Sequence, residues 1–264
     1  MISKIKISLI ILSLLILTTD LWANPKKITF ACNRDPNPPY VMGSGGDIDL
    51  NKPGITLEVL HLLEKSLNLE IHFEHVPAAR IFAWIENNKV DGGFHFSFKT
   101  KRAKSIAYPM KDGKVDPDKR LMAMKYFLYK LKDSPLKWDG VKFQNLNDKI
   151  GVNLGFSIVG DLKKMGVDVH EGTLTINLMR MLIKKRINGV VTIETLGDFS
   201  IKSHPKEFVN VVKVSPPVKK KNYYLALSYQ FVKKHPTLAE NIWNEIMKIR
   251  ESGKFEEIEK KYLE

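Results

Sequence analysis

The stretches that decide the fold read KITFAC at residues 27–32, GITLEVLHLLEKSL at 54–67 and EIHF at 70–73, with VDGGF at 90–94. The first alternates apolar and polar residues with period two, which predicts a strand. The second carries leucines at the spacing of one helix face, at Leu57, Leu60, Leu63 and Leu67. Pro77 favours the start of another helix, where the N–H that proline lacks would have no partner. The order strand, helix, strand, helix, strand indicates an α/β fold.

A second unit of the same kind follows the polar stretch 111–119. Further strands are predicted at 120–131, 149–154, 189–193, 209–214 and 223–228. Helices are predicted at about 157–165 and 173–185, and two more near the C-terminus carry the apolar stripes Leu238, Ile242, Ile246, Ile249 and Phe255, Ile258, Tyr262. We expect Pro216 and Pro217 to separate the last two strands. Gly253 fits a helix C-cap position.

The first residues are typical of a secretory signal peptide. Lys4 and Lys6 precede the apolar run 7–17, and Leu21-Trp22-Ala23 ends in a small residue. The run is shorter than the roughly 20 residues that span a bilayer. We therefore expect cleavage near Ala23 and a soluble protein exported to the periplasm. An uncleaved membrane anchor is the alternative.

Composition excludes several function classes. The single cysteine, Cys32, allows no internal disulfide and is expected in the core. The formal net charge is +13, but the lysines are scattered, and no aromatic-interleaved basic stripe indicates a nucleic-acid partner. No HExxH or paired Cys/His spacing is present, so neither a metal site nor a cofactor is expected. Ser157 lacks the glycine two residues later that a hydrolase nucleophile elbow needs.

Short motifs then follow one another in a fixed order: Pro38-Pro39-Tyr40, Gly54 with Glu58, Asp91-Gly92-Gly93, Ser97 with Arg102, Gly151-Val152 with Gly155 and Ser157, Tyr224–Ser228, His235-Pro236, Trp243, Ile249 and Gly253. In this order and spacing, the chain from about Ile28 to Leu263 resembles the family 3 extracellular solute-binding proteins. That family is best known for periplasmic receptors of polar amino acids in ABC import.

The resemblance implies a two-lobe periplasmic-binding-protein fold of type II with two hinge crossings. Lobe 1 would comprise residues 24–119 plus 223–264, and lobe 2 residues 120–222. The crossings would lie near 121–125 and 214–221. The cleft between two lobes joined in this way traps a ligand when the lobes close. The implied protein is a monomer without enzymatic activity, whose partners are a small-molecule ligand and a membrane ABC permease or sensor protein.

The resemblance also indicates ligand-binding residues. Arg102 would hold the ligand carboxylate, because a guanidinium presents a planar fork of donors that matches it. Ser97 precedes Arg102 in a loop after a strand, where ligands of open α/β sheets bind. Tyr40 follows two prolines and would stack on the ligand. Ser157 would add a donor from the second lobe, at a helix start that attracts anions. Arg80 lies in a first helical turn, where the helix dipole does not favour a cation.

One position departs from the family pattern. Amino-acid receptors of the family usually carry an aspartate for the ligand ammonium in the second lobe, and Ile193 stands at the matching position. Glu194 would substitute only if the strand ended before it, because neighbouring strand residues point to opposite faces. A carboxylate without an amine, or another polar solute, therefore stays open. So does a cyclohexadienyl-dehydratase-like enzyme that uses Glu194 or Glu58.

Overall fold

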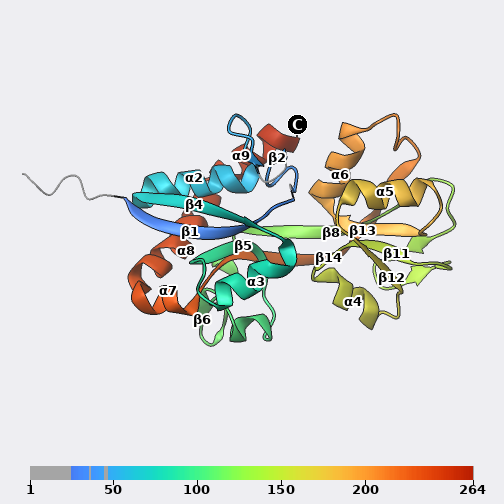
Figure 1. The fold of residues 1–264 in the computed structure, drawn as a ribbon. Helices are drawn as coiled ribbons and strands as arrows, with labels where there is room; N and C mark the ends of the chain where they lie inside the picture. The colour runs from blue at the N-terminus through green and yellow to red at the C-terminus, as the bar shows by residue number, and fades with distance from the viewer. Residues whose placement is uncertain (1–24, 36, 45–46, 264) are drawn as a thin grey trace, which may run out of the picture.

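The computed structural model describes residues 25–35, 37–44 and 47–263, and the predicted signal peptide lies outside them. The chain forms two α/β bodies, which lie left and right in Figure 1 and are joined by two long strands. The strands are β1 (Lys26–Asn33), β2 (Gly43–Ser44), β3 (Asp47–Ile48), β4 (Leu69–Val76), β5 (Gly92–Ser97), β6 (Met110–Lys111), β7 (Lys114–Val115), β8 (Met122–Leu131), β9 (Lys137–Trp138), β10 (Phe143–Gln144), β11 (Ile150–Asn153), β12 (Val169–Gly172), β13 (Gly189–Ile193) and β14 (Val211–Leu227). The helices are α2 (Ile55–Leu67), α3 (Ala78–Glu86), α4 (Ile158–Lys164), α5 (Thr175–Ile183), α6 (Glu194–Ser203), α7 (Tyr229–Lys234), α8 (Pro236–Glu251) and α9 (Lys254–Leu263), with 3₁₀ turns η2 (Arg102–Lys104) and η3 (Pro117–Lys119).

One sheet runs through both bodies in the order β12-β11-β13-β8-β14-β5-β1-β4. Pairing is parallel at each end, between β1 and its neighbours β4 and β5, and between β11 and its neighbours β12 and β13. It is antiparallel wherever β8 or β14 takes part. The fold is therefore the predicted α/β architecture, in which β8 and β14 are the two strands that cross between the lobes.

Apolar side chains on both faces of the sheet explain this architecture. In β1, Ile28 and Phe30 face one core while Ala31 faces another, as the period of two requires. The first core is shared with α2, α8 and α9, and the second with α3. A third core packs α5 against the second lobe. Helices on both faces are what a largely parallel sheet needs, because both of its faces must be buried.

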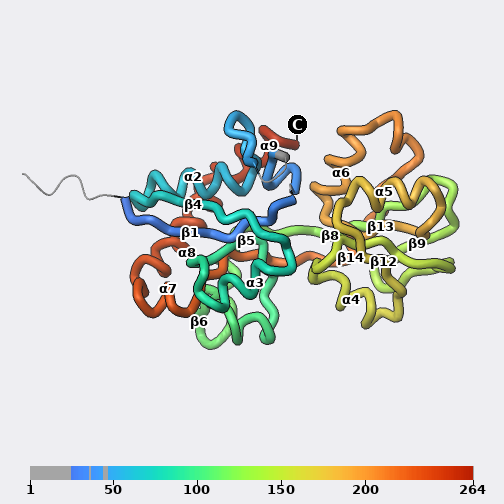
Figure 2. The backbone as a smooth tube through the Cα atoms, viewed as in Figure 1, coloured from blue at the N-terminus to red at the C-terminus, as the bar shows by residue number. Residues whose placement is uncertain are grey.

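The crossing strands form the connection between the lobes. Residues 219–223 of β14 pair with 122–126 of β8. Beyond this segment β14 continues into the first lobe beside β5, and β8 continues into the second lobe beside β13. Figure 2 shows the connection as two backbone threads, green for β8 and orange-red for β14. The lobes therefore meet at a narrow, strand-paired hinge.

Most predicted elements are present, but the structure also differs from the prediction. The segments 209–214 and 223–228 belong to one strand, β14, because a register shift between Val214 and Lys219 takes Pro216 and Pro217 out of the ladder without ending the strand. The sequence did not predict strand β12, helices α6 and α7, or the two-residue strands β2, β3, β6, β7, β9 and β10. Gly253 does follow the end of α8 with φ 82°, which confirms its predicted role.

Among the described residues, no helix is both long and apolar enough to cross a membrane.

Candidate functional site

A cavity of about 750 Å³ lies between the two lobes. Its walls include the carboxyl ends of the parallel strands β1, β5 and β11, where open α/β sheets bind ligands. Lobe 1 contributes Ala31, Asn33, Asp35, Asn37, Pro38, Ala78, Ala79, Ile81, Phe82, Phe94, His95, Phe96 and Arg102. Lobe 2 contributes Asn153, Leu154, Gly155, Phe156, Thr173, Leu174, Thr175, Ile176, Arg180, Leu196, Phe199, Ser200, Ser203 and His204.

Arg102 is the predicted site residue that lines this cavity, and its guanidinium is held from two sides. Its Nη1 donates to the Ser97 carbonyl at 3.1 Å and to Ser97 Oγ at 2.9 Å. The guanidinium carbon lies 4.8 Å from the centroid of the Phe82 ring, a cation–π contact. Among the described residues, Nε and Nη2 have no hydrogen-bond partner. The remaining part of the fork is therefore free to bind an anion.

The electrostatic surroundings of Arg102 favour a negative ligand. The pKa of Lys99 is lowered, first by burial and then by the positive charges of Arg102 and Lys221. Neighbouring cations repel one another, so an anion that binds beside them relieves this repulsion. Ser97 itself is buried and does not line the cavity; it contacts Arg102 instead.

His95 is a site residue that the sequence did not single out. It lies on β5 with φ 65°, a left-handed conformation that is uncommon outside glycine and is concentrated at functional sites. Its Nε2 and Thr56 Oγ1 are hydrogen-bonded at 2.7 Å, and its ring meets Tyr40 and Phe94 edge to face. Burial lowers the pKa of His95 to about 3, so the side chain is neutral near pH 7.

Tyr40 is buried and bridges the two lobes. Its hydroxyl lies 2.5 Å from Thr195 Oγ1, which belongs to α6 in lobe 2. The Tyr40 loop is fixed against α2, where Gly54 has φ 110° and a Cβ would come within 2.5 Å of the Tyr40 carbonyl oxygen. Tyr40 does not line the cavity, and it reaches the cavity wall through the ring of His95.

Ser157 is buried where lobe 2 meets the hinge. Its Oγ accepts a hydrogen bond from Lys221 Nζ at 3.1 Å and lies 3.4 Å from the Tyr223 hydroxyl. Lys221 also pairs with Asp161 of α4. Ser157 takes the N-cap position of α4 without a side-chain capping bond. The structure therefore places Ser157 in a polar network with the crossing strand β14.

Arg80 and Glu194 lie away from the cavity wall. Arg80 is exposed on α3, between residues that do line the cavity. Strand β13 ends at Ile193, and Glu194 is the first residue of α6. This meets the condition under which Glu194 would take the place of the family's usual aspartate. Its carboxylate, however, pairs with Lys213 at 2.9 Å. Ile193 is buried in the core.

Two polar side chains of the lobe 2 wall are paired with neighbouring residues. Arg180 forms a bidentate pair with Glu207, at 2.8 Å and 3.2 Å. Asn153 donates to Thr175 Oγ1 at 3.0 Å and accepts from Thr192 Oγ1 at 2.8 Å. These bonds orient Arg180 and Asn153 within the wall, and Glu207 neutralises the charge of Arg180.

Sequence reasoning missed the phenylalanines that line the cavity. The sequence predicts an apolar stripe of Ile81, Trp84 and Ile85 for the helix after Pro77, and Phe82 falls outside it. An apolar residue off the stripe is the signal that was available. Phe156 precedes Ser157, and a ligand-binding role was predicted only for the serine. Phe199 belongs to α6, which was not predicted at all.

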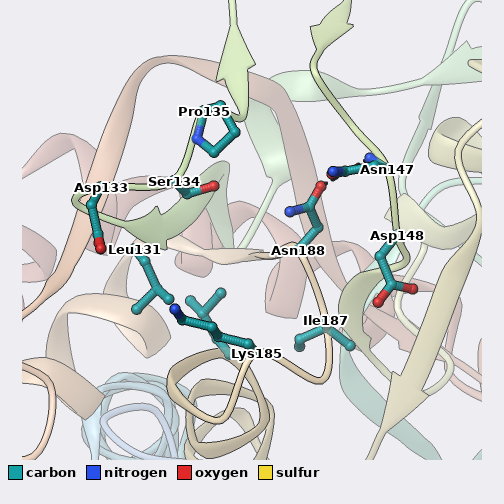
Figure 3. Close-up of a pocket in the computed structure, with 10 residues that line it drawn as sticks. Leu131, Asp133, Ser134, Pro135, Asn147, Asp148, Lys185, Ile187 and Asn188 are labelled. Carbon is teal, nitrogen blue, oxygen red and sulfur yellow. Dashed lines mark hydrogen bonds between the residues drawn. The ribbon is translucent and has the colours of Figure 1, made fainter.

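A second cavity, of about 430 Å³, lies within lobe 2 (Figure 3). Its walls include Asn147 and Asn188, where the Asn147 N–H donates to Asn188 Oδ1 at 3.1 Å. These residues precede β11 and β13, so the cavity lies at the amino ends of the parallel strands. Ligands of open α/β sheets bind at the opposite edge, which favours the cavity between the lobes as the functional site.

The family model for bacterial extracellular solute-binding proteins, family 3, matches residues 31–264. The chain therefore belongs to this family, as the motif order indicated. No curated protein matches the chain.

Solved structures show the same fold at low sequence identity. A histidine kinase sensor domain with similarity to periplasmic binding proteins aligns with TM-score 0.71 and 18% identity, covering 91% of this chain and 97% of that one. The GluR0 ligand-binding core in complex with L-glutamate aligns with TM-score 0.70 and 16% identity, covering 92% and 99%. The arginine-, lysine-, histidine-binding protein ArtJ from Geobacillus stearothermophilus aligns with TM-score 0.68 and 18% identity, covering 90% and 95%. These neighbours establish the two-lobe periplasmic-binding-protein fold.

Proposed function

We propose that the chain is a periplasmic receptor that captures a small carboxylate-bearing solute between its lobes and delivers it to an ABC permease. The observation that carries the proposal is the Arg102 fork, which is held by Ser97 and Phe82 at the cavity wall with Nε and Nη2 unpaired among the described residues. Similarity to amino-acid-binding proteins such as ArtJ supports capture without chemistry.

In this proposal the ligand role of Arg102 is direct, and Ser97 is a positioning residue. Lobe 1 comprises residues 24–119 plus 223–264 and lobe 2 residues 120–222, with closure about β8 and β14. The ligand-binding roles of Tyr40, Arg80, Ser157 and Glu194 stay predictions, because none of these residues lines the cavity. The receptor acts as a monomer.

A sensor role is the second candidate, because a histidine kinase sensor domain is among the structural neighbours. In that case the closed lobes would present their outer surface to a membrane sensor protein in place of a permease. Pull-down with membranes, with and without ligand, separates the two roles by the identity of the retained partner.

The enzyme alternative has weaker support. The two carboxylates considered for acid–base chemistry do not line the cavity: Glu194 pairs with Lys213, and Glu58 accepts hydrogen bonds from Lys261 and Tyr262. A dehydratase needs such a group beside its substrate. Turnover of a prephenate-like acid by the purified protein would overturn our proposal of a binding protein.

A thermal-shift screen of carboxylates, amino acids and neutral polar solutes tests the receptor function. A ligand that binds only the folded state raises stability by roughly 2.7 kcal/mol at 100 times its dissociation constant. We expect anionic compounds to raise the melting temperature and neutral ones to leave it unchanged. If no compound in the three classes raises it, the proposed function is wrong.

A further inference from the structure

Aromatic rings make up a large part of the apolar lining of the cavity. Five phenylalanines line it, three from lobe 1 and two from lobe 2: Phe82, Phe94, Phe96, Phe156 and Phe199. Phe94 and Phe96 are buried in the sheet, whereas the other three are half-buried. Phe82 packs against Phe96 with ring centroids 4.7 Å apart, and Phe156 meets Tyr126 edge to face. Two of the half-buried rings, Phe82 in lobe 1 and Phe156 in lobe 2, are therefore packed against neighbouring rings.

Two leucines on the lobe 2 side are poorly covered. Leu154 is 56% exposed and Leu174 is 36% exposed, and both line the cavity. Apolar surface of this kind gains free energy when it is removed from water. A ligand with an apolar body would cover these side chains, whereas a small, fully polar ligand would leave them wet.

The charges of the cavity indicate the other end of the ligand. The described lining residues include two arginines, two histidines and one carboxylate, Asp35, which is exposed. Arg180 forms an ion pair with Glu207, which neutralises its charge, whereas among the described residues Arg102 has no carboxylate partner. The lobe 2 lining residues that the structure describes include no carboxylate, and Glu194, which does not line the cavity, is paired with Lys213. A ligand ammonium buried against this wall would lose its hydration without gaining a counter-charge.

The anion anchor and the aromatic wall are adjacent, since the Arg102 guanidinium lies 4.8 Å from the Phe82 ring centroid. A ligand that uses both needs only a short spacer between its acid and its apolar body. We infer that the cavity between the lobes takes an aromatic, or similarly bulky apolar, carboxylate without an ammonium group. This inference rests on the proposed receptor function and names its ligand class.

Isothermal titration calorimetry of the whole mature chain tests the inference with four matched probes. These are 3-phenylpropanoate, L-phenylalanine, L-glutamate and 2-phenylethanol. We expect 3-phenylpropanoate to bind at least about tenfold more tightly than L-phenylalanine, because the two differ chiefly in the ammonium group. We expect L-glutamate to bind more weakly still, because it lacks the ring, and 2-phenylethanol, which lacks the acid, not to bind.

A variant pair locates the aromatic subsite. Phe199→Ala removes a cavity ring from α6, and Phe199→Leu keeps the apolar volume if the alanine variant does not fold. Phe143→Ala is the matched control, because Phe143 is half-buried in lobe 2 against Trp138 and does not line the cavity. We expect Phe199→Ala to weaken 3-phenylpropanoate binding by about tenfold and Phe199→Leu to weaken it less. The control variant should bind as the unmodified protein does.

The outcomes separate this inference from the proposed function. Equal or tighter binding of L-phenylalanine or L-glutamate would overturn the ligand class and leave the receptor function standing. Unchanged affinity in the Phe199 variants would overturn the aromatic subsite. Absence of binding by every carboxylate and amino acid tried, with an intact thermal unfolding transition, would overturn both.

Discussion

The two walls of the cavity differ in how they treat charge. On the lobe 1 wall, Arg102 has open donor positions, and burial keeps His95, another lining residue, neutral. On the lobe 2 wall, Arg180 is neutralised by Glu207. Glu194, which follows the position of the family's usual aspartate, does not line the cavity and pairs with Lys213.

The difference indicates a division of roles between the lobes. In the function that we propose, lobe 1 would recognise the ligand charge, because a charge-assisted hydrogen bond needs a donor that is not already paired. Lobe 2 would cover the ligand with apolar side chains, including the partly exposed Leu154 and Leu174. Such a receptor would select its ligand by charge through lobe 1 and gain apolar burial when the lobes close.

The largest effect is expected from Arg102→Ala. Removal of the anchor should weaken binding of an anionic ligand by at least about 30-fold, the equivalent of roughly 2 kcal/mol. Titration calorimetry measures the change, and Arg186→Ala, an exposed arginine of lobe 2, is the control. A change of less than about threefold at Arg102 would remove lobe 1 as the charge-recognising wall.

A pH-dependent effect is expected from His95. Its pKa is about 3 in the folded state and about 6.5 when unfolded, so the unfolded state binds the extra proton between these values. The contribution of neutral His95 to the free energy of unfolding is fully present above about pH 6.5. It falls as the pH drops, by at most about 1.4 kcal/mol per pH unit.

The variant His95→Asn isolates this contribution, because asparagine tolerates the left-handed backbone at this position. We expect the free energy of unfolding, measured by urea denaturation between pH 7 and pH 4, to depend less steeply on pH in the variant. The difference in slope should correspond to about one bound proton. Identical slopes in the two proteins would show that His95 is protonated in the folded state within this range.

A smaller effect is expected from Tyr40→Phe. The substitution keeps the ring against His95 and removes the hydrogen bond to Thr195 across the lobes. Loss of one such bond should lower the free energy of unfolding by about 1 kcal/mol. A double-mutant cycle with Thr195→Val measures the coupling, and additive effects would mean that the two hydroxyls do not stabilise the lobe arrangement.

The smallest effect is expected from Arg180→Ala, which tests the lobe 2 wall directly. Because Glu207 already occupies this guanidinium, we expect ligand affinity to change by less than about threefold. Calorimetry under the same conditions as for Arg102→Ala makes the two walls comparable. An effect as large as that at Arg102 would show that both lobes bind the ligand charge.

Local patterns in the sequence predicted the elements that have strong periodicity. Helix α2 and strand β13 match their predicted ranges closely, because leucines at helical spacing and a short β-branched run are decided by nearby residues. Helix α6 was missed because it begins directly after β13 and its first turn has no conventional capping residue, since Ile193 takes the N-cap position.

The candidate site was only partly accessible to such reasoning. Arg102 was found through the order of short motifs. The contacts that decide its availability and that of Glu194 join residues of different elements, Arg102 with Ser97 and Glu194 with Lys213. The same is true of the Tyr40–Thr195 bond, which links positions 155 residues apart.

The amino-acid sequence by itself therefore determined the alternation of strands and helices, because it depends on residue types at short spacing. The order of its short motifs indicated the family and, through that resemblance, the arginine that lines the cavity. Only the tertiary structure decided which polar groups are already paired and which aromatic rings meet between the lobes. The physical reason is that hydrogen bonds, ion pairs and burial are set by distances in space, and the sheet order brings distant segments together only after the chain has folded.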